Sequence, residues 1–167
     1  MMMLTQERLK ELIDYDPETG LLSNRITRNS RALKGREAGC INERGYRQVW
    51  VDGTKYYEHR IVWCFVTGCW PEEIDHWNGI RSDNRWVNLR EADRSQTCWN
   101  AEGKGVLSAP RGVNRRGDRP KWRAQISARG RSYHLGDFDT IDEAQQAYRD
   151  AAKRLHGEFA FHNRPKL

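Results

Sequence analysis

Hydrophobic and polar positions along this chain follow two periods, which predict both helices and strands. In residues 5–13 the apolar side chains recur three and four positions apart, the spacing of one face of a helix. Residues 59–68 are mostly apolar and end in glycine, which indicates a buried helix. Residues 46–58 instead alternate on either side of Asp52-Gly53, a dipeptide typical of a type I′ turn, and predict a β-hairpin.

The last third of the chain shows the order strand, strand, helix. Residues 121–127 and 131–138 alternate between apolar and polar side chains, which predicts a second hairpin. Thr140 and Glu143 then fit a capping box at the start of an amphipathic helix. With residues 111–116 as a first strand, we expect a small three-stranded antiparallel sheet packed on one helix. The fold class is therefore α+β.

A stretch bearing Gly, Ser and Pro at residues 102–110 reads as a linker. We therefore predict two domains, residues 1–105 and 106–167. Hydrophobic residues make up 37% of the 167 residues, which suits two modest cores better than one large core.

Charge separates the two predicted domains. The net charge is +6, yet residues 1–105 hold 16 Lys and Arg against 16 Asp and Glu, whereas residues 106–167 hold 13 against 7. Such a basic second domain favours double-stranded DNA as partner over a merely solvated charged surface. The longest strictly apolar run, residues 61–66, is too short to span a membrane, and the N-terminus has no apolar signal segment, so we expect a cytoplasmic protein and no membrane partner.

The four cysteines form no CxxC pair, and the gap between Cys64 and Cys69 is not one that zinc sites use. We expect reduced, mostly packed thiols and no structural zinc.

Residues 74–89 read IDHWNGIRSDNRWVNL and predict a strand, a polar loop and a return strand, with a helix after them. Asp75 can give a divalent cation the oxygen ligand it prefers, and His76 can accept a proton from water. The amide of Asn88 can hold the loop and orient the histidine. The alternative is that Asp75 and His76 only finish a strand and cap a turn, and spacing alone leaves both interpretations open.

Residues 12–100 resemble the HNH endonucleases, specifically the phage and intron-encoded homing type. The match rests on DYDPETGLL, on GYRQVWVDGTKYYEHRIVW and above all on EEIDHWNGIRSDNRWVNLREADRSQ. The resemblance implies a ββα-metal finger, preceded here by an N-terminal helix and hairpin, that grips one Mg²⁺ or Mn²⁺ ion. It implies that Asp75 is a metal ligand, His76 the general base and Asn88 the structural asparagine. His59 matches a family histidine that we interpret as structural.

One position departs from the family pattern. The third signature residue, a His or Asn that is the second metal ligand, is Thr97 in this chain. A hydroxyl is a poorer ligand, and Asn100, one helical turn further on, is an alternative donor. This departure keeps a second interpretation open, in which the protein has lost catalysis and acts as a non-cleaving DNA-binding or regulatory protein.

Residues 110–160 resemble the Apetala-type DNA-binding domain of plant ethylene-responsive transcription factors, through KWRAQI, HLGDFDT and EAQQAYRDAA. In that family a three-stranded sheet backed by one helix lies in the major groove. Arg111 and Arg116 are retained at contact positions, and Asn114 and Gln125 suit reading of adenine edges. The other residues that we expect to contact DNA are Arg115, Arg123, Ser127, Arg129, Arg131 and His134. Of these, the arginines suit phosphate contacts.

Trp122 and Tyr133 alternate with polar neighbours, which favours places in the core beneath the helix over base stacking. Taken together, the two resemblances imply a phage-encoded endonuclease that nicks duplex DNA and leaves a 5′-phosphate and a 3′-hydroxyl. One finger has one active site, so a monomer would nick one strand, and a homodimer would be needed to cut both at once.

Overall fold

The computed structural model describes residues 4–100, 110–115 and 120–160. Its internal contacts divide the chain into two units, residues 1–93 and 94–167. The predicted DNA contact Arg116 and residues 102–109 of the predicted linker lie outside the described residues. None of the helices in the described ranges is long and apolar enough to cross a membrane.

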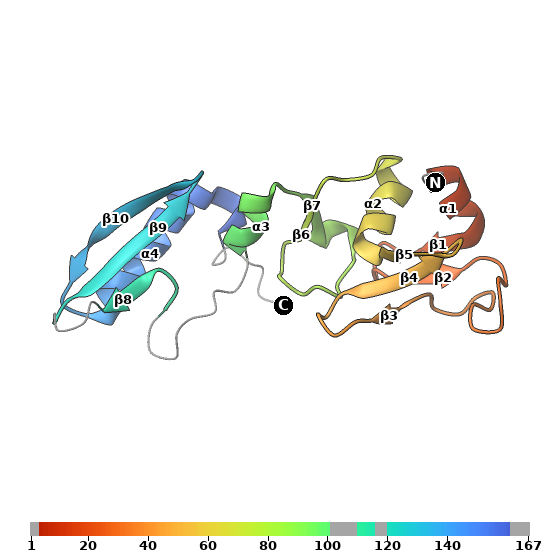
Figure 1. Ribbon diagram of the computed structural model, residues 1–167, viewed down its shortest axis with the longest axis horizontal. Coiled ribbons are helices and arrows are strands. Elements are labelled where there is room, and N and C mark those ends of the chain that lie inside the picture. The colour runs from red at the N-terminus through yellow and green to blue at the C-terminus, as the bar shows by residue number, and fades with distance from the viewer. Residues whose placement is uncertain (1–3, 101–109, 116–119, 161–167) are drawn as a thin grey trace. The chain divides into compact units, whose positions relative to one another are not determined.

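The first unit combines two helices with short antiparallel strand pairs (Figure 1). Its elements are α1 (Gln6–Leu12), β1 (Ile13–Tyr15), β2 (Leu22–Asn24), β3 (Cys40–Ile41), β4 (Arg47–Val51), β5 (Thr54–Tyr57), α2 (Glu58–Thr67), β6 (Ile74–His76), the 3-10 turn η1 (Trp86–Asn88) and β7 (Leu89–Glu91). The sheets pair β1 with β2, β3 with β4 with β5, and β6 with β7.

Local signals account for most of these elements. Thr5 caps α1, since its hydroxyl accepts from the backbone N–H of Arg8, and α2 ends at Gly68, which has the left-handed φ of 79°. Asp52 and Gly53 both have positive φ, as a type I′ turn requires, and join β4 to β5. The predicted helices and the first hairpin are therefore confirmed. Their apolar faces share one core that includes Leu9, Leu12, Ile13, Leu22, Val51, Ile61 and Val62.

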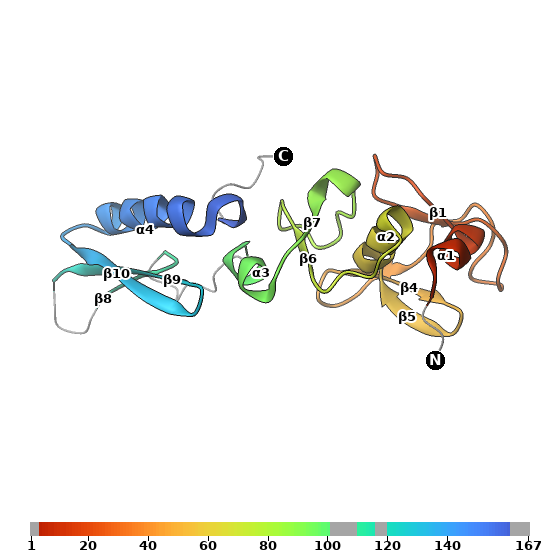
Figure 2. The same ribbon diagram turned by 90° about the horizontal axis from the view of Figure 1, so that it is seen from above.

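The second unit holds a sheet of order β10-β9-β8 and a long helix. Its elements are α3 (Arg94–Asn100), β8 (Val113–Arg115), β9 (Trp122–Ala128), β10 (Arg131–Phe138), α4 (Ile141–His156) and the 3-10 turn η2 (Gly157–Phe159). Figure 2 shows α4 lying along one face of this sheet. The α+β class and the three-stranded sheet backed by one helix are thus confirmed.

The second unit also follows its sequence signals closely. Thr140 and Glu143 form the predicted capping box at the start of α4. Ile126, which faces α4, packs with Tyr148 and the alanines of the helix. Trp122 packs against this core as expected, but Tyr133 is 41% exposed on the edge strand β10, so its predicted place in the core is wrong.

Helix α3 belongs to the second unit by its contacts, although it follows β7 directly in the sequence. The Trp99 ring stacks on His156 at the end of α4, with ring centroids 4.5 Å apart. The Arg111 guanidinium donates to the backbone carbonyls of Trp99 and Cys98. By contacts the chain divides between residues 93 and 94, and the predicted domains, residues 1–105 and 106–167, stay a prediction. The two strands of the predicted ββα-metal finger, β6 and β7, pair with one another. The finger as a whole stays a prediction.

The cysteines are free thiols, of which Cys64 is buried in the first unit. Cys40, Cys69 and Cys98 are exposed, so the expectation that most of the thiols are packed is wrong.

Candidate active site

The short β6–β7 hairpin carries Asp75 and His76. Strand β6 pairs with β7 so that Asp75 lies opposite Arg90 and His76 opposite Leu89. All three residues of β6 are buried, and both Asp75 and His76 are only 5% exposed. The hairpin thus holds a carboxylate and an imidazole at consecutive, buried positions of one strand.

The loop between these strands is held by its own asparagines. The side-chain oxygen of Asn88 accepts from the Asn78 backbone N–H at 2.9 Å, and its amide nitrogen donates to the Asp83 carbonyl at 2.7 Å. The Asn78 amide donates to the Asp83 carboxylate, which also accepts from Arg85. Asn88 therefore makes the loop-holding contacts expected of it, and its contribution to catalysis stays a prediction.

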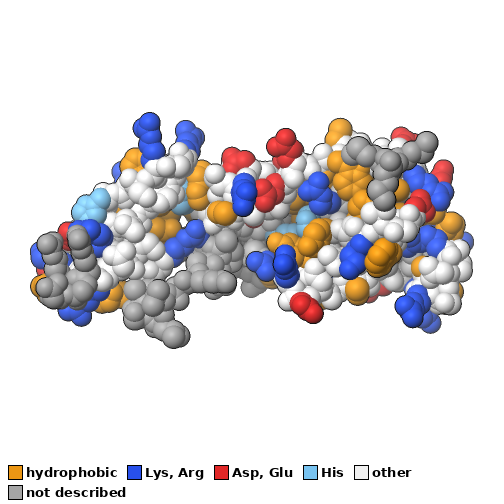
Figure 3. All heavy atoms as spheres, in the orientation of Figure 1, with side chains coloured by type: hydrophobic (Ala, Val, Ile, Leu, Met, Phe, Trp, Pro, Cys, Tyr) orange, Lys and Arg blue, Asp and Glu red, His pale blue; other side chains and the backbone are white. Residues whose placement is uncertain are grey.

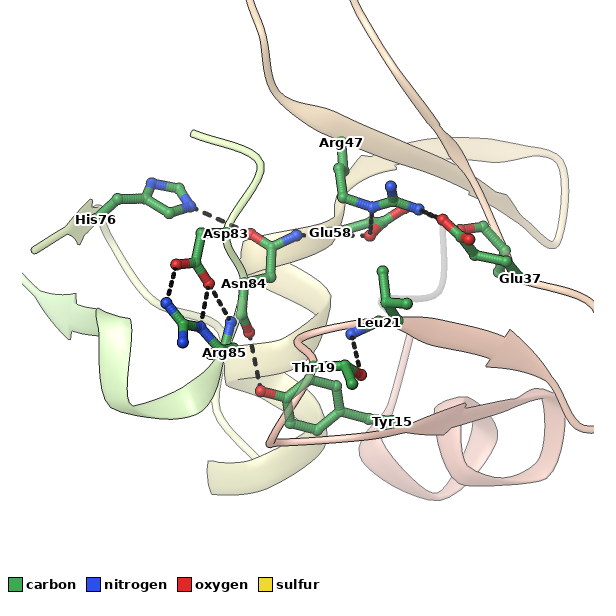
Figure 4. Close-up of polar contacts among 11 residues, drawn as sticks. Tyr15, Thr19, Leu21, Glu37, Arg47, Glu58, His76, Asp83, Asn84 and Arg85 are labelled. Carbon is green, nitrogen blue, oxygen red and sulfur yellow. Dashed lines mark hydrogen bonds and ion pairs between the residues drawn. The ribbon is translucent and has the colours of Figure 1, made fainter. Parts of the chain in front are cut away.

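The histidine is oriented by a different asparagine from the one we expected. His76 Nε2 lies 3.1 Å from Oδ1 of Asn84 (Figure 4). The side chain of Asn88 instead bonds within the loop. The His59 ring packs edge-on against the His76 ring at 5.1 Å between centroids. Burial lowers the pKa of His76 below its ordinary value, against the raising effects of the bond with Asn84 and of the Asp75 carboxylate. At neutral pH the ring is therefore uncharged and can accept a proton.

Asp75 forms a buried ion pair with the residue across the hairpin. Arg90 Nη2 and Nε lie 2.6 Å and 2.8 Å from the same carboxylate oxygen, Oδ2. The Asp75 side chain is 6% exposed and that of Arg90 is 16% exposed. The side chain of Arg90 thus anchors the Asp75 carboxylate through one of its two oxygens, Oδ2.

Comparison with known proteins relates this part of the chain to a protein family. Residues 56–97, which span β6, β7 and the loop between them, match the model of the HNH endonuclease family. The chain is also 30% identical over 105 residues to Protein 3.8 of Escherichia phage T7, an alignment that covers 61% of this chain and 86% of that protein. The chain belongs to the HNH endonuclease family. No solved structure matches it.

The family match ends at residue 97, so it includes Asp75, His76 and Asn88 and reaches Thr97. It does not extend to residues 110–160, whose resemblance to the Apetala-type domain stays a prediction. Thr97 lies in α3 of the second unit, and its role as second metal ligand stays a prediction as well.

HNH nucleases generally use a divalent metal ion, and the residues present are chemically suited to one. Asp75 offers hard carboxylate oxygens, and Mg²⁺ typically needs only one or two carboxylates because it keeps several waters and binds substrate phosphates. Among the described residues, no group of three or more His, Cys, Asp or Glu side chains is arranged to hold a metal ion.

His59 lies beside this HNH site at the start of α2. It is 8% exposed, its ring stacks on Tyr57 at 5.5 Å between centroids, and its Nδ1 has no hydrogen-bond partner among the described residues. Burial lowers the pKa of His59 to about 3, so the ring stays neutral. This packing agrees with the structural role that we expected of His59.

A buried polar network behind the histidine was not predicted from the sequence. Asn84 Nδ2 donates to Glu58 Oε2, which also accepts from Arg47 Nε at 2.8 Å, and Arg47 in turn bonds Glu37 (Figure 4). Glu58 is fully buried. Burial raises the pKa of Glu58 to about 7, against the lowering effect of its bonds from Arg47 and Asn84. In the sequence Glu58 stands between Tyr57 and His59, with no local pattern that signals its burial.

The exposed face of the β8–β10 sheet carries five of the predicted DNA contacts. Cross-strand register pairs Asn114 with Arg123 and Gln125 with His134. Arg123 also bonds Asp137 at 3.0 Å, which offsets part of its charge. The residues on this sheet face, which lies opposite α4, are Asn114, Arg123, Gln125, Ser127, Ser132, His134 and Asp137.

The other predicted contacts lie elsewhere in the second unit. Arg111 is engaged with the α3 carbonyls, and Arg115 lies over the Trp122 ring at 5.8 Å, on the side of the sheet that Trp122 occupies. Arg129 and Arg131 are exposed at the turn between β9 and β10. In Figure 3, Lys and Arg side chains project from the surface of this unit.

Proposed function

We propose that this protein is a metal-dependent DNA endonuclease that nicks duplex DNA. The observation that carries the proposal is that two consecutive, buried residues of β6 provide a carboxylate, at Asp75, and a neutral imidazole, at His76. A family whose members cleave nucleic acids matches these same residues.

His76 is the general base in this proposal. Its neutral ring takes a proton from the attacking water, a step that typically contributes about 10²–10⁴-fold to the rate. Asp75, with Thr97 as second ligand, would hold one Mg²⁺ or Mn²⁺ ion. A bound cation supplies the positive charge that stabilises the phosphate and the departing oxygen. Asn88 keeps the loop closed around the site.

Arg90 holds the carboxylate in place before substrate arrives. Both of its bonds go to Oδ2 of Asp75, so it anchors that carboxylate oxygen. It also competes with a cation for that oxygen, so we expect weak metal binding without DNA and tighter binding with it.

The second unit delivers the duplex to this site. Asn114 and Gln125 are side by side on one sheet face with Arg123, Ser127 and His134, a mixture suited to base edges and phosphates. We propose that this face enters the major groove, as in the Apetala-type domain, and that Arg129 and Arg131 contact phosphates.

One active site per chain cuts one strand, so a monomer leaves a nick with a 5′-phosphate and a 3′-hydroxyl. Cleavage of both strands requires a homodimer or two visits. The phage relative supports a phage-encoded protein. We propose that this enzyme is of the homing type and acts in the cytoplasm of the host cell.

A second candidate function is a DNA-binding protein that no longer cleaves. It is favoured by Thr97 at the ligand position and by the ion pair that occupies Asp75. Mutation of groups that hydrogen-bond a metal's ligands typically costs about 10–100-fold in metal affinity or activity, so a poorer ligand at position 97 should cost at least as much.

Nicking of supercoiled plasmid with Mg²⁺ or Mn²⁺ separates the two. The endonuclease is supported if the chain nicks and both His76→Ala and Asp75→Asn abolish nicking. Asp14→Asn, which removes an exposed carboxylate paired with Arg25, is the matched control and should keep full activity. Absence of nicking that Thr97→Asn restores would identify a decayed nuclease.

A further inference from the structure

Asn84 joins several distant segments at the back of the candidate active site. It is 1% exposed. Its side chain bonds His76 Nε2 at 3.1 Å through Oδ1 and contacts Glu58 Oε2 at 3.5 Å through Nδ2 (Figure 4). Its backbone carbonyl accepts from the Tyr15 hydroxyl at 2.9 Å. Because both the backbone and the side chain of Asn84 are held, Asn84 can in turn hold the His76 ring in one orientation.

The direction of the Asn84 amide follows from Glu58. The oxygen Glu58 Oε2 already accepts from Arg47 Nε, and Arg47 is itself held by Glu37. A carboxylate oxygen in that position attracts the Nδ2 donor of Asn84 and repels Oδ1, so the reverse amide orientation is unfavourable. The 3.5 Å contact is long. It still selects the amide orientation, because the interaction with Glu58 Oε2 is attractive for Nδ2 and repulsive for Oδ1. The oxygen of the amide therefore faces the histidine.

We propose that Asn84 is a positioning residue that selects the tautomer of His76. Since Oδ1 only accepts hydrogen bonds, the hydrogen of the neutral ring must lie on Nε2. The lone pair that takes a proton is then on Nδ1, at a ring angle that the hydrogen bond holds. This inference rests on the proposed function, in which His76 is the general base, and it assigns the base to a single ring atom.

The N-terminal part of the first unit supports this arrangement. A Cβ at Gly20 would lie 2.6 Å from the backbone carbon of Asn84 and 2.4 Å from the nitrogen of Arg85. The backbone at residue 84 is therefore in close contact with the turn after β1, as well as bonded to Tyr15. Residues far from His76 in sequence thereby set the position of its hydrogen-bond partner.

The ring tautomer can be measured directly by ¹⁵N NMR of the histidine-labelled full chain at neutral pH. The His76 signals are assigned from their loss in His76→Ala. We expect a protonated Nε2 and a pyridine-type Nδ1 in the wild-type protein. An Nδ1-protonated ring in the wild-type protein would overturn the proposal, whatever any variant does.

Two Asn84 variants and one control then test whether Asn84 determines the tautomer of His76. Asn84→Ala should give a mixture of tautomers and lower kcat for nicking by about 10–100-fold, with KM changed less than about 3-fold. Asn84→Asp keeps an acceptor facing Nε2 and should keep the wild-type tautomer. Asn78→Ala removes an asparagine of the same loop, also buried, whose side chain bonds Asp83 and the Ile80 N–H. It should reduce stability and leave the tautomer unchanged.

The outcomes distinguish this inference from the proposed function. A wild-type tautomer in Asn84→Ala would refute the inference even if nicking falls, because the loss would then be structural. If Asn84→Ala does not fold, Asn84→Asp decides, since an altered tautomer in that variant contradicts the inference. If the wild-type protein does not nick at all, the proposed function fails while the NMR measurement still tests the hydrogen bond.

Discussion

The close approach of Gly20 to residues 84 and 85 allows a quantitative test of how the first unit holds its active-site loop. In Gly20→Ala the new Cβ would lie 2.4 Å from Arg85 N and 2.6 Å from Asn84 C. Real Cβ atoms do not approach so closely, and both neighbours are backbone atoms that no rotamer change can move away. Overpacking of this kind typically costs about 1–3 kcal/mol.

Gly45→Ala is the matched control for this substitution. Gly45 has φ +80°, close to the +75° of Gly20, but a Cβ there would meet nothing within 4 Å. Both variants therefore carry the same left-handed strain, about 1–2 kcal/mol, and the same change in unfolded-chain entropy. Their difference isolates the contact with Asn84 and Arg85.

Urea unfolding of the two variants measures this difference. We expect Gly20→Ala to unfold with a free energy about 1–3 kcal/mol lower than Gly45→Ala, at an unchanged slope. We also expect folded Gly20→Ala to nick more slowly than Gly45→Ala, because a shifted Asn84 misorients His76. Two variants equal in stability to within about 0.5 kcal/mol would refute the reasoning.

Three further predictions concern charged groups. Arg90→Ala should destabilise the metal-free protein by about 3 kcal/mol, because a buried ion pair loses one partner. In thermal unfolding, added Mn²⁺ should restore part of this lost stability. No response of the variant to Mn²⁺ would count against a cation at Asp75. Burial raises the pKa of Glu58 from 4.5 in the unfolded chain to about 7, so the folded state binds one more proton between these pH values. The free energy of unfolding should therefore fall as pH rises from 4.5 to about 7. Glu58→Gln should remove this pH dependence, and an unchanged pH dependence in the variant would assign it to other groups. Replacing Arg129 and Arg131 by Ala should weaken duplex binding and reduce the salt dependence by about 0.9 per lost phosphate contact, whereas Arg25→Ala in the first unit should change neither.

Local signals in the sequence predicted the elements, because each depends on residues close together in the chain. Asp52-Gly53 specifies its turn through two positive φ angles, and the Thr140–Glu143 capping box closes within one helical turn. The alternation around Ile126 likewise predicted which face of β9 meets α4. These parts of the fold needed no knowledge of the tertiary structure.

What the sequence did not predict depends on contacts between distant residues. Asn84 and Glu58 are 26 positions apart, and their pairing behind His76 exists only once α2 and the loop have packed together. The assignment of α3 to the second unit depends on Trp99 stacking against His156, which no local pattern signals. Tyr133 followed the right alternation yet is exposed, because it lies on an edge strand.

The same reasoning applies to the candidate site. Asp75 and His76 could be selected from the sequence because they are neighbours in a recognisable stretch. Both are buried, and their roles in catalysis stay predictions. The bond of Arg90 to Asp75 depends on the register of β6 with β7, which follows from the length of the loop between them rather than from either strand alone.

The location of a bound cation tests the central claim most directly. We would collect anomalous diffraction from crystals of His76→Ala with duplex DNA and Mn²⁺, in which cleavage is blocked. The account predicts a manganese peak about 2.1 Å from a carboxylate oxygen of Asp75, in contact with a DNA phosphate. Manganese bound elsewhere, with the Asp75 carboxylate still paired with Arg90, would contradict it.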